Sequence, residues 1–205
     1  FSTAAGAQQY SDDELSAIVD EAHRAGIRVA AHAHGDAGIR ACIRAGVDCI
    51  EHGSLASDDT VKLMAETGTF LVGTCALADH LAIDRIHPAL QKKAAEVFPQ
   101  ARRMLGKAIE AGVKIACGSD APAIPHGTQA DELIAMVDRG MTPLQALRAA
   151  TLTSADLIER AHELGRLSPG YLADIIAVPG DPTEDVKVTK DVRFVMKDGH
   201  VYKGP

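Results

Sequence analysis

The chain has 205 residues, which is long enough to bury the core of one large domain. Its net charge is −7 and no basic run occurs, so we expect no nucleic acid as a partner. No apolar stretch approaches the roughly 20 residues that a membrane span requires, so we expect no membrane partner either. No signal peptide is visible, and we expect a soluble protein, cytoplasmic by default. The four cysteines lack C-x-x-C spacing, which favours buried thiols over a zinc site.

Helical and extended patterns alternate through the first 117 residues. Each of four predicted helices ends in a small residue or Thr followed by Gly, and a short apolar strand begins at once. Short apolar strands separated by helices indicate parallel pairing, with both faces of the sheet covered. The helices are predicted over 12–25, 37–45, 57–67 and about 88–111, and the strands over 27–33, 47–50, 69–72 and 113–117.

The pattern changes in the last third of the chain. Three more helices are predicted, and from about Gly165 turns and strands replace them. Asp198-Gly199 is a strong two-residue hairpin signal. We therefore divide the chain into residues 1–164 and a β segment, 165–205. The helices are predicted over 129–139, 143–150 and 154–160, and the strands over 173–179, 192–197 and 200–203.

Polar residues stand at the C-terminal ends of three predicted strands. His32 and His34 close the first strand and His52 follows the second. Asp120 follows the fourth. In a (β/α)₈ barrel all such ends converge on one site, whereas a doubly wound sheet binds its ligand at one switch point. Several polar strand ends therefore favour the barrel.

Alternation along the strands predicts where these side chains point. His32 and His34 lie on the face opposite the apolar positions of their strand, so they point into the barrel mouth if the apolar face meets the helices. The same argument directs His52 to the mouth and Glu51 to the helices. His126 lies in a proline-flanked loop beside the mouth.

Imidazole and carboxylate groups suit a borderline divalent cation such as zinc. Zinc lowers the pKa of bound water to about 7, and Asp120 can take a proton from the attacking water. A single histidine at a strand end is more often structural, but three polar strand ends in one repeating pattern favour a site. His34 and His126 stay balanced between substrate contact and a structural role.

Three motifs together resemble the amidohydrolase superfamily, in particular its prolidase-like, imidazolonepropionase-related branch. They are His32-Ala33-His34-Gly35, Glu51-His52-Gly53 and Gly118-Ser119-Asp120-Ala121-Pro122. Residues 165–174 resemble that family's return into its β-sandwich. The resemblance implies an α/β fold: residues 1–164 form the C-terminal half of a (β/α)₈ TIM barrel, strands five to eight, and 165–205 form part of a small β-sandwich.

The resemblance also implies a binuclear centre of divalent metal, usually zinc. His32 and His52 would hold one metal. Asp120 would hold the other and carry a proton from the bridging hydroxide to the leaving amine. His34 and His126 carry over only as substrate contacts.

Half of the family's ligand set has no counterpart in this sequence. The family has a His-x-His pair on the first strand and, in this branch, a carboxylated lysine on the fourth. We therefore expect an N-terminal half of the same protein to complete the barrel, as a separate fragment or in the same chain. We also expect a homo-oligomer.

The function implied is hydrolysis of an amide C–N bond in a small-molecule amide or dipeptide. The candidates are an Xaa-Pro dipeptidase, a carboxypeptidase-like enzyme and an ochratoxin-type amidase that acts on N-acyl amino acids. One alternative is a deaminase of the same superfamily, but deaminases commonly have Glu where this chain has Gly35. The other alternative is a non-catalytic half-barrel that serves as a scaffold.

Overall fold

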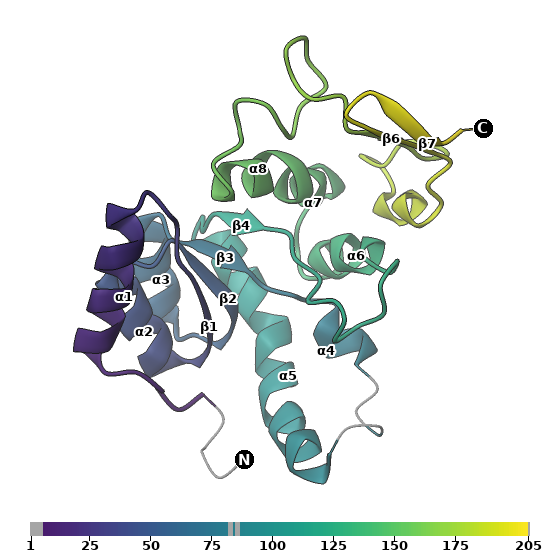
Figure 1. Ribbon diagram of the computed structural model, residues 1–205. Helices are drawn as coiled ribbons and strands as arrows, with labels where there is room; N and C mark the ends of the chain where they lie inside the picture. Colours follow the sequence, from purple (N-terminus) through teal and green to yellow (C-terminus); the bar gives the residue numbers. More distant parts are fainter. Residues whose placement is uncertain (1–5, 82–83, 85–86, 205) are drawn as a thin grey trace.

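The computed structural model describes residues 6–81, 84 and 87–204 (Figure 1). Two sheets occur in this part of the chain. The first region contains α1 (Asp12–Arg24), β1 (Ala30–Gly35), α2 (Asp36–Ala45), β2 (Cys49–Leu55), α3 (Asp58–Thr67), β3 (Phe70–Val72), α4 (Leu77–His80), α5 (Pro88–Glu110) and β4 (Ile115–Ala116). The second contains α6 (Ala130–Asp138), α7 (Pro143–Arg148), a π-helical turn (Ala149–Thr153), α8 (Ser154–Leu157), β5 (Ile175–Ala177), a 3₁₀ turn (Val186–Lys190), β6 (Phe194–Lys197) and β7 (His200–Lys203).

The first sheet is parallel, with its strands in the order β1-β2-β3-β4. This order follows the chain, so the described sheet has no reversal of strand order and lacks the switch point of a doubly wound fold. The register pairs Ala31 with Ile50 and Leu71 with Ile115. The predicted alternation of helices and parallel strands is confirmed.

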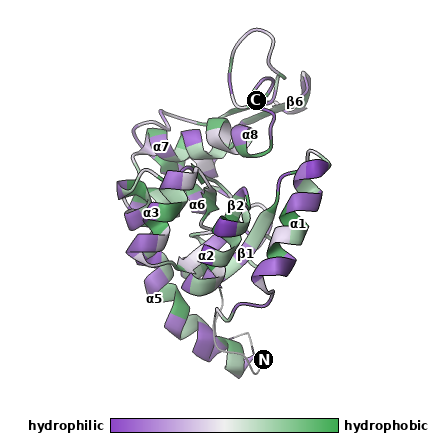
Figure 2. Cartoon of the chain, turned by 90° about the vertical axis from the view of Figure 1, so that its left-hand side faces the viewer, coloured by the Kyte–Doolittle hydropathy of each residue, from purple (hydrophilic) through white to green (hydrophobic). Residues whose placement is uncertain are grey.

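The helices α1, α2, α3 and α5 pack on one face of this sheet (Figure 1). They are amphipathic, and Figure 2 shows hydrophobic and hydrophilic residues alternating along α1, α3 and α5. The predicted capping box starts α1, because Ser11 accepts from the Glu14 amide and Glu14 accepts from the Ser11 amide. The strand residues on this face belong to the main core, and they include Ile50, Leu71 and Ile115.

The opposite face of the sheet carries a smaller buried cluster. Cys49, Phe70, Val72 and Ala116 form it, and Leu157 of α8 packs against it. These positions have the parity of His32 in the strand register. The histidine-bearing face is therefore the one turned away from the main layer of helices.

Two predicted boundaries are wrong for identifiable reasons. The first strand begins at Ala30 and not at residue 27, because the amide of Val29 donates to the Asp48 carboxylate at 2.8 Å and not to a neighbouring strand. The helix α8 ends at Leu157, whereas the predicted helix ended at residue 160. Glu159 adopts a φ of 60°, which no helix continues.

The second sheet is antiparallel and contains β5, β6 and β7. The predicted hairpin across Asp198-Gly199 is confirmed as β6 and β7. The strands β6 and β7 lie above the first sheet in Figure 1, and the 3₁₀ turn Val186–Lys190 contacts α6. A search of the described residues for a helix long and apolar enough to cross a membrane finds none.

Asp36 joins the C-terminal ends of β1 and β2. Its carboxylate accepts from the Ser57 amide at 2.7 Å and from Thr60 Oγ1 at 2.6 Å, and Arg40 also donates to it. Burial alone raises the pKa of Asp36. The hydrogen bonds from Thr60, Ser57 and Arg40 outweigh burial and lower the pKa to about 2.

We predict that Asp36→Asn lowers the free energy of unfolding of the whole protein at pH 7 by about 2 kcal/mol. The depressed pKa stabilises the native state above the ordinary aspartate pKa of about 3.9, and this stabilisation is lost as the pH falls towards 2. The gap between variant and wild type should therefore close below about pH 4 in urea titrations. Asp59→Asn, a change at an exposed site on α3, is the control. A gap that stays constant with pH would contradict the assignment.

Candidate metal centre

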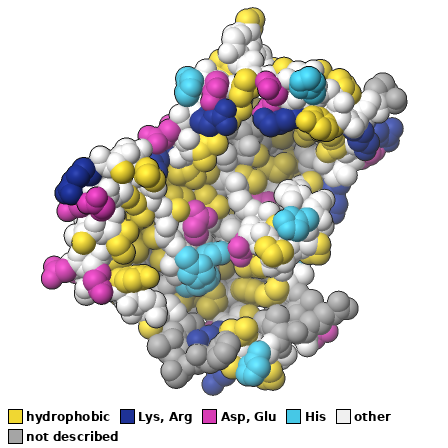
Figure 3. Space-filling model, in the orientation of Figure 1, with side chains coloured by type: hydrophobic (Ala, Val, Ile, Leu, Met, Phe, Trp, Pro, Cys, Tyr) yellow, Lys and Arg dark blue, Asp and Glu magenta, His cyan; other side chains and the backbone are white. Residues whose placement is uncertain are grey.

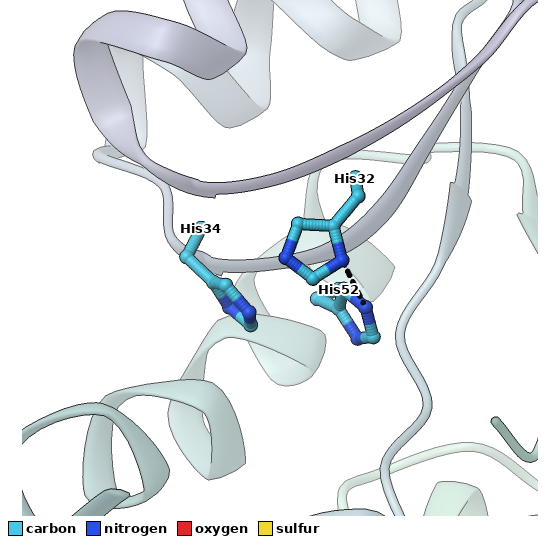
Figure 4. Close-up of side chains that lie close together, drawn as sticks. All are labelled: His32, His34 and His52. Carbon is cyan, nitrogen blue, oxygen red and sulfur yellow. Dashed lines mark hydrogen bonds between the residues drawn. The ribbon is translucent and has the colours of Figure 1, made fainter. Parts of the chain in front are cut away.

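Three histidines from β1 and β2 lie together at the C-terminal edge of the first sheet (Figure 4). His32, His34 and His52 each offer one ring nitrogen, and these nitrogens lie within 4.8 Å of one another. The ring centroids are 4.5 Å apart for His32 and His52 and 4.8 Å apart for the other two pairs. Such a group of imidazoles can bind a divalent cation.

His32 and His52 present their nitrogens to each other. His52 Nε2 lies 3.0 Å from His32 Nδ1. This separation fits a shared ion, because both nitrogens can lie at the Zn–N distance of about 2.0–2.1 Å from one zinc. His52 is 6% exposed, whereas His32 is open to solvent, so an ion can reach the pair from the side of His32.

The backbone in the middle of β2 brings His52 to the side of His32. His52 and Gly53 have φ values of 69° and 61°, which are left-handed and interrupt the two-residue alternation of a strand. A Cβ on Gly53 would lie 2.9 Å from Leu71 Cδ1. This turn therefore favours glycine at position 53, because any side chain there would meet both the positive φ and Leu71.

The prediction that Glu51 faces the helices is wrong. Glu51 is the register partner of His32, and Cys49 Sγ donates to Glu51 Oε1 at 3.1 Å. Burial raises the pKa of Glu51. The bond from Cys49 and the charge of His32 oppose this rise, and the charge of Asp120 adds to it. The signal that the sequence analysis missed is Ile50, whose large apolar side chain marks the helix-facing parity of β2.

Hydroxyl groups orient two of the three rings. Thr74 Oγ1 lies 2.7 Å from His52 Nδ1, and Ser54 Oγ lies 2.9 Å from His34 Nδ1. These bonds use the Nδ1 atoms of both rings. The Nε2 atom of His52 is left to face His32.

Burial keeps two of the imidazoles neutral. It lowers the pKa of His34 to about 4, with help from the positive charge of His52 and His32 and against the charge of Asp120. Burial and then His32 lower the pKa of His52 to about 4 as well. A metal ligand must be deprotonated, so both rings are ready to bind a cation at neutral pH.

Asp120 lies in the segment after β4. It is exposed, its φ is 55°, and its charge acts on both His34 and Glu51. It is therefore directed to the same region, although it does not belong to the group of three close ligand atoms. His126 is exposed and does not line the two cavities beside the histidines.

A cavity of about 600 Å³ extends from the histidines. Its wall includes His32 and His34, the segment 6–10 and apolar side chains of α5 such as Val97 and Phe98. Figure 3 shows histidine and acidic side chains next to each other on this face, among hydrophobic ones. A second cavity of about 20 Å³ lies beside His52. Sequence reasoning did not foresee that α5 forms part of this wall.

We predict that Gly118→Ala destabilises the whole protein by about 1–3 kcal/mol, because overpacking forces the backbone to shift. A Cβ at this position would lie 2.5 Å from Val72 Cγ1, just before Asp120. Gly38→Ala on α2 is the control, since its nearest contact is 3.9 Å away and Ala favours a helix. Denaturant unfolding measures both changes. Equal stability of Gly118→Ala and wild type would contradict the tight approach.

The chain is similar to several proteins of known sequence. It is 40% identical to an ochratoxinase of Aspergillus niger, over 96% of this chain and 42% of that protein. It is 29% identical to an imidazolonepropionase of Geobacillus kaustophilus over 94% of this chain and 45% of that protein. The chain thus spans about half the length of the curated relatives that it matches.

Solved structures show the same relationship. A Xaa-Pro dipeptidase with methionine bound in its active site matches with a TM-score of 0.92 and 41% identity, over 98% of this chain and 51% of that one. The ochratoxinase of A. niger matches with a TM-score of 0.84 and 39% identity, over 96% and 46%. The model of the amidohydrolase family matches residues 2–202. This α/β chain therefore belongs to the amidohydrolase family.

Proposed function

We propose that the whole protein is a metal-dependent hydrolase that cleaves an amide bond in a dipeptide or an N-acyl amino acid. The observation that carries this proposal is the pair of facing nitrogens on His32 and His52, beside a cavity and the Asp120 carboxylate. The names of two relatives, ochratoxinase and Xaa-Pro dipeptidase, support amide substrates. The second name describes a dipeptide substrate.

We propose that His32 Nδ1, His52 Nε2 and the Asp120 carboxylate hold a binuclear centre, with zinc as the metal. Imidazole and carboxylate are the donor types that zinc takes in catalytic sites. The chemistry that such a cation supplies is polarisation of a carbonyl oxygen and a lower pKa of water. The neutral state of His52 supports its role as a ligand.

The chain's own residues are proposed to transfer the proton and to bind the substrate. Asp120 is proposed to take the proton of the attacking water and to deliver it to the nitrogen of the leaving amine, as a general base and then a general acid. His34 lines the large cavity and is proposed to contact the substrate. His126 is proposed as a second substrate contact because it lies in the proline-flanked loop that follows Asp120. The apolar wall from α5 suits a hydrophobic group on the substrate.

We propose that residues 1–164 supply half of a (β/α)₈ barrel and that 165–205 supply part of a β-sandwich. The described sheet ends at β1 and β4, which leaves two strand edges to be paired or covered. The relatives are about twice as long, which supports an N-terminal half of the same protein as the missing partner. A homo-oligomer and a cytoplasmic location are also proposals.

A deaminase is the less favoured enzyme. That hypothesis calls for Glu at the position of Gly35, where a Cβ would lie 1.9 Å from the Gly6 carbonyl oxygen. A side chain at residue 35 would therefore clash with the segment before α1. A non-catalytic half-barrel predicts no bound metal, so the experiment below separates it from an enzyme.

We predict that chelation abolishes hydrolysis of N-acyl amino acids or Xaa-Pro dipeptides by the whole protein, and that zinc restores it. Asp120→Asn should lower kcat by about 10²–10⁴-fold, the usual contribution of a proton-transfer group. Steady-state kinetics and elemental analysis give the two readouts.

His200→Ala is the matched control, because this exposed histidine lies on β7, in the second sheet. We expect it to retain both metal and activity. Hydrolysis that persists in the metal-free protein would contradict the proposed function, as would an Asp120→Asn variant as fast as wild type.

A further inference from the structure

The loop after β3 holds a strained residue against His52. Thr74 is 6% exposed and has a φ of 44°, a left-handed value that β-branched residues rarely adopt. Backbone strain of this kind persists only where the surroundings hold it, and it gathers at functional sites. The left-handed φ of Thr74 therefore directs attention to its contact with His52.

The hydroxyl of Thr74 determines which nitrogen of His52 carries the proton. Thr74 Oγ1 donates its one hydrogen to the carbonyl of Gly73 at 2.9 Å. It can then only accept at its second contact, 2.7 Å from His52 Nδ1. His52 Nδ1 therefore carries the N–H of this hydrogen bond, and in the imidazole tautomer with its one N–H on Nδ1 the lone pair lies on Nε2. That lone pair faces His32 Nδ1 at 3.0 Å.

A buried carboxylate on α6 holds this loop in place. Glu132 is 0% exposed, and its two oxygens accept from the amides of Cys75 at 2.8 Å and Ala76 at 2.7 Å. The carbonyl of Cys75 accepts from Arg139 at 3.1 Å. The backbone amide and carbonyl of Cys75 are thus both held by hydrogen bonds to α6 and its C-cap, Arg139. These bonds explain how the left-handed φ of the preceding residue, Thr74, persists.

We propose that Thr74 and Glu132 are positioning residues that hold His52 with Nε2 unprotonated, and that they thereby set the affinity of the centre for a divalent cation. This inference rests on the proposed function in one respect, the role of His52 as a ligand. Thr74 acts through the ring of His52, and Glu132 acts through the loop. Partners of this kind fix the tautomer and orientation of a histidine ligand.

The test is the zinc dissociation constant of the whole protein, measured by competition with a chromophoric chelator. Thr74→Val keeps the shape and the β-branch but removes the hydroxyl, and we expect zinc to bind about 10–100-fold more weakly. Thr74→Ser restores the hydroxyl and should bind zinc like wild type. Thr69→Val removes another buried hydroxyl, next to β3 but bonded to Thr67, and should leave the zinc affinity unchanged.

Glu132→Gln gives a second variant of similar volume. Its amide group offers one acceptor where two loop amides need one each, so the loop loses a hydrogen bond. We expect weaker zinc binding than in wild type, with the unfolding transition still cooperative. This variant carries the test if Thr74→Val does not fold.

Nitrogen-15 NMR of the metal-free wild type gives a readout that needs no variant. We expect the proton of His52 on Nδ1. A proton on Nε2, or equal zinc affinity of wild type and Thr74→Val, would overturn the inference. Wild type that binds no zinc would overturn the proposed function together with it, whereas a Thr74→Val variant that binds zinc like wild type would overturn only this inference.

Discussion

The pairing of β1 with β2 is the constraint on which the site depends. It places His32 opposite Glu51 and brings the end of β2 beside the end of β1. A slip of one residue would turn every side chain of a strand to the other face, so the register must be fixed. Two carboxylates hold the ends of this pair: Asp48 binds the Val29 amide, and Asp36 binds the Ser57 amide. The position of the imidazoles thus follows from hydrogen bonds outside the site.

The same geometry sets the electrostatics of the site. Three imidazoles within 4.8 Å would repel one another if they were charged, and burial further disfavours a charge on His34 and His52. The rings of His34 and His52 are therefore neutral and able to bind a cation. The exposed Asp120 adds negative charge to the same region. This distribution of charge favours a divalent cation over an anion at the edge of the sheet.

Much of this arrangement could be predicted from the sequence. The repeated succession of a helix, a glycine and an apolar strand predicted the parallel sheet. The polar residues at the strand ends predicted that His32, His34 and His52 are neighbours. Glu51 was misplaced because the left-handed φ of His52 breaks the alternation on which the prediction relied. Such a value depends on tertiary contacts with the loop that carries Thr74, which no local pattern encodes.

The residues that form the wall of the cavity could not be predicted from the sequence either. The helix α5 was predicted as a helix, but its periodicity does not tell which neighbour covers its apolar face. Val97 and Phe98 line the cavity because the described chain packs α5 against β2, a contact between distant segments. The likeness to dipeptidase and ochratoxinase structures shows that this layout recurs in longer proteins.

The most direct test of the account is anomalous X-ray diffraction at the zinc edge, from crystals of the whole protein grown with zinc. We predict an anomalous peak within bonding distance of both His32 Nδ1 and His52 Nε2, the two atoms that face each other here. A peak elsewhere, or none at this pair, would contradict the claim that these histidines form a metal centre.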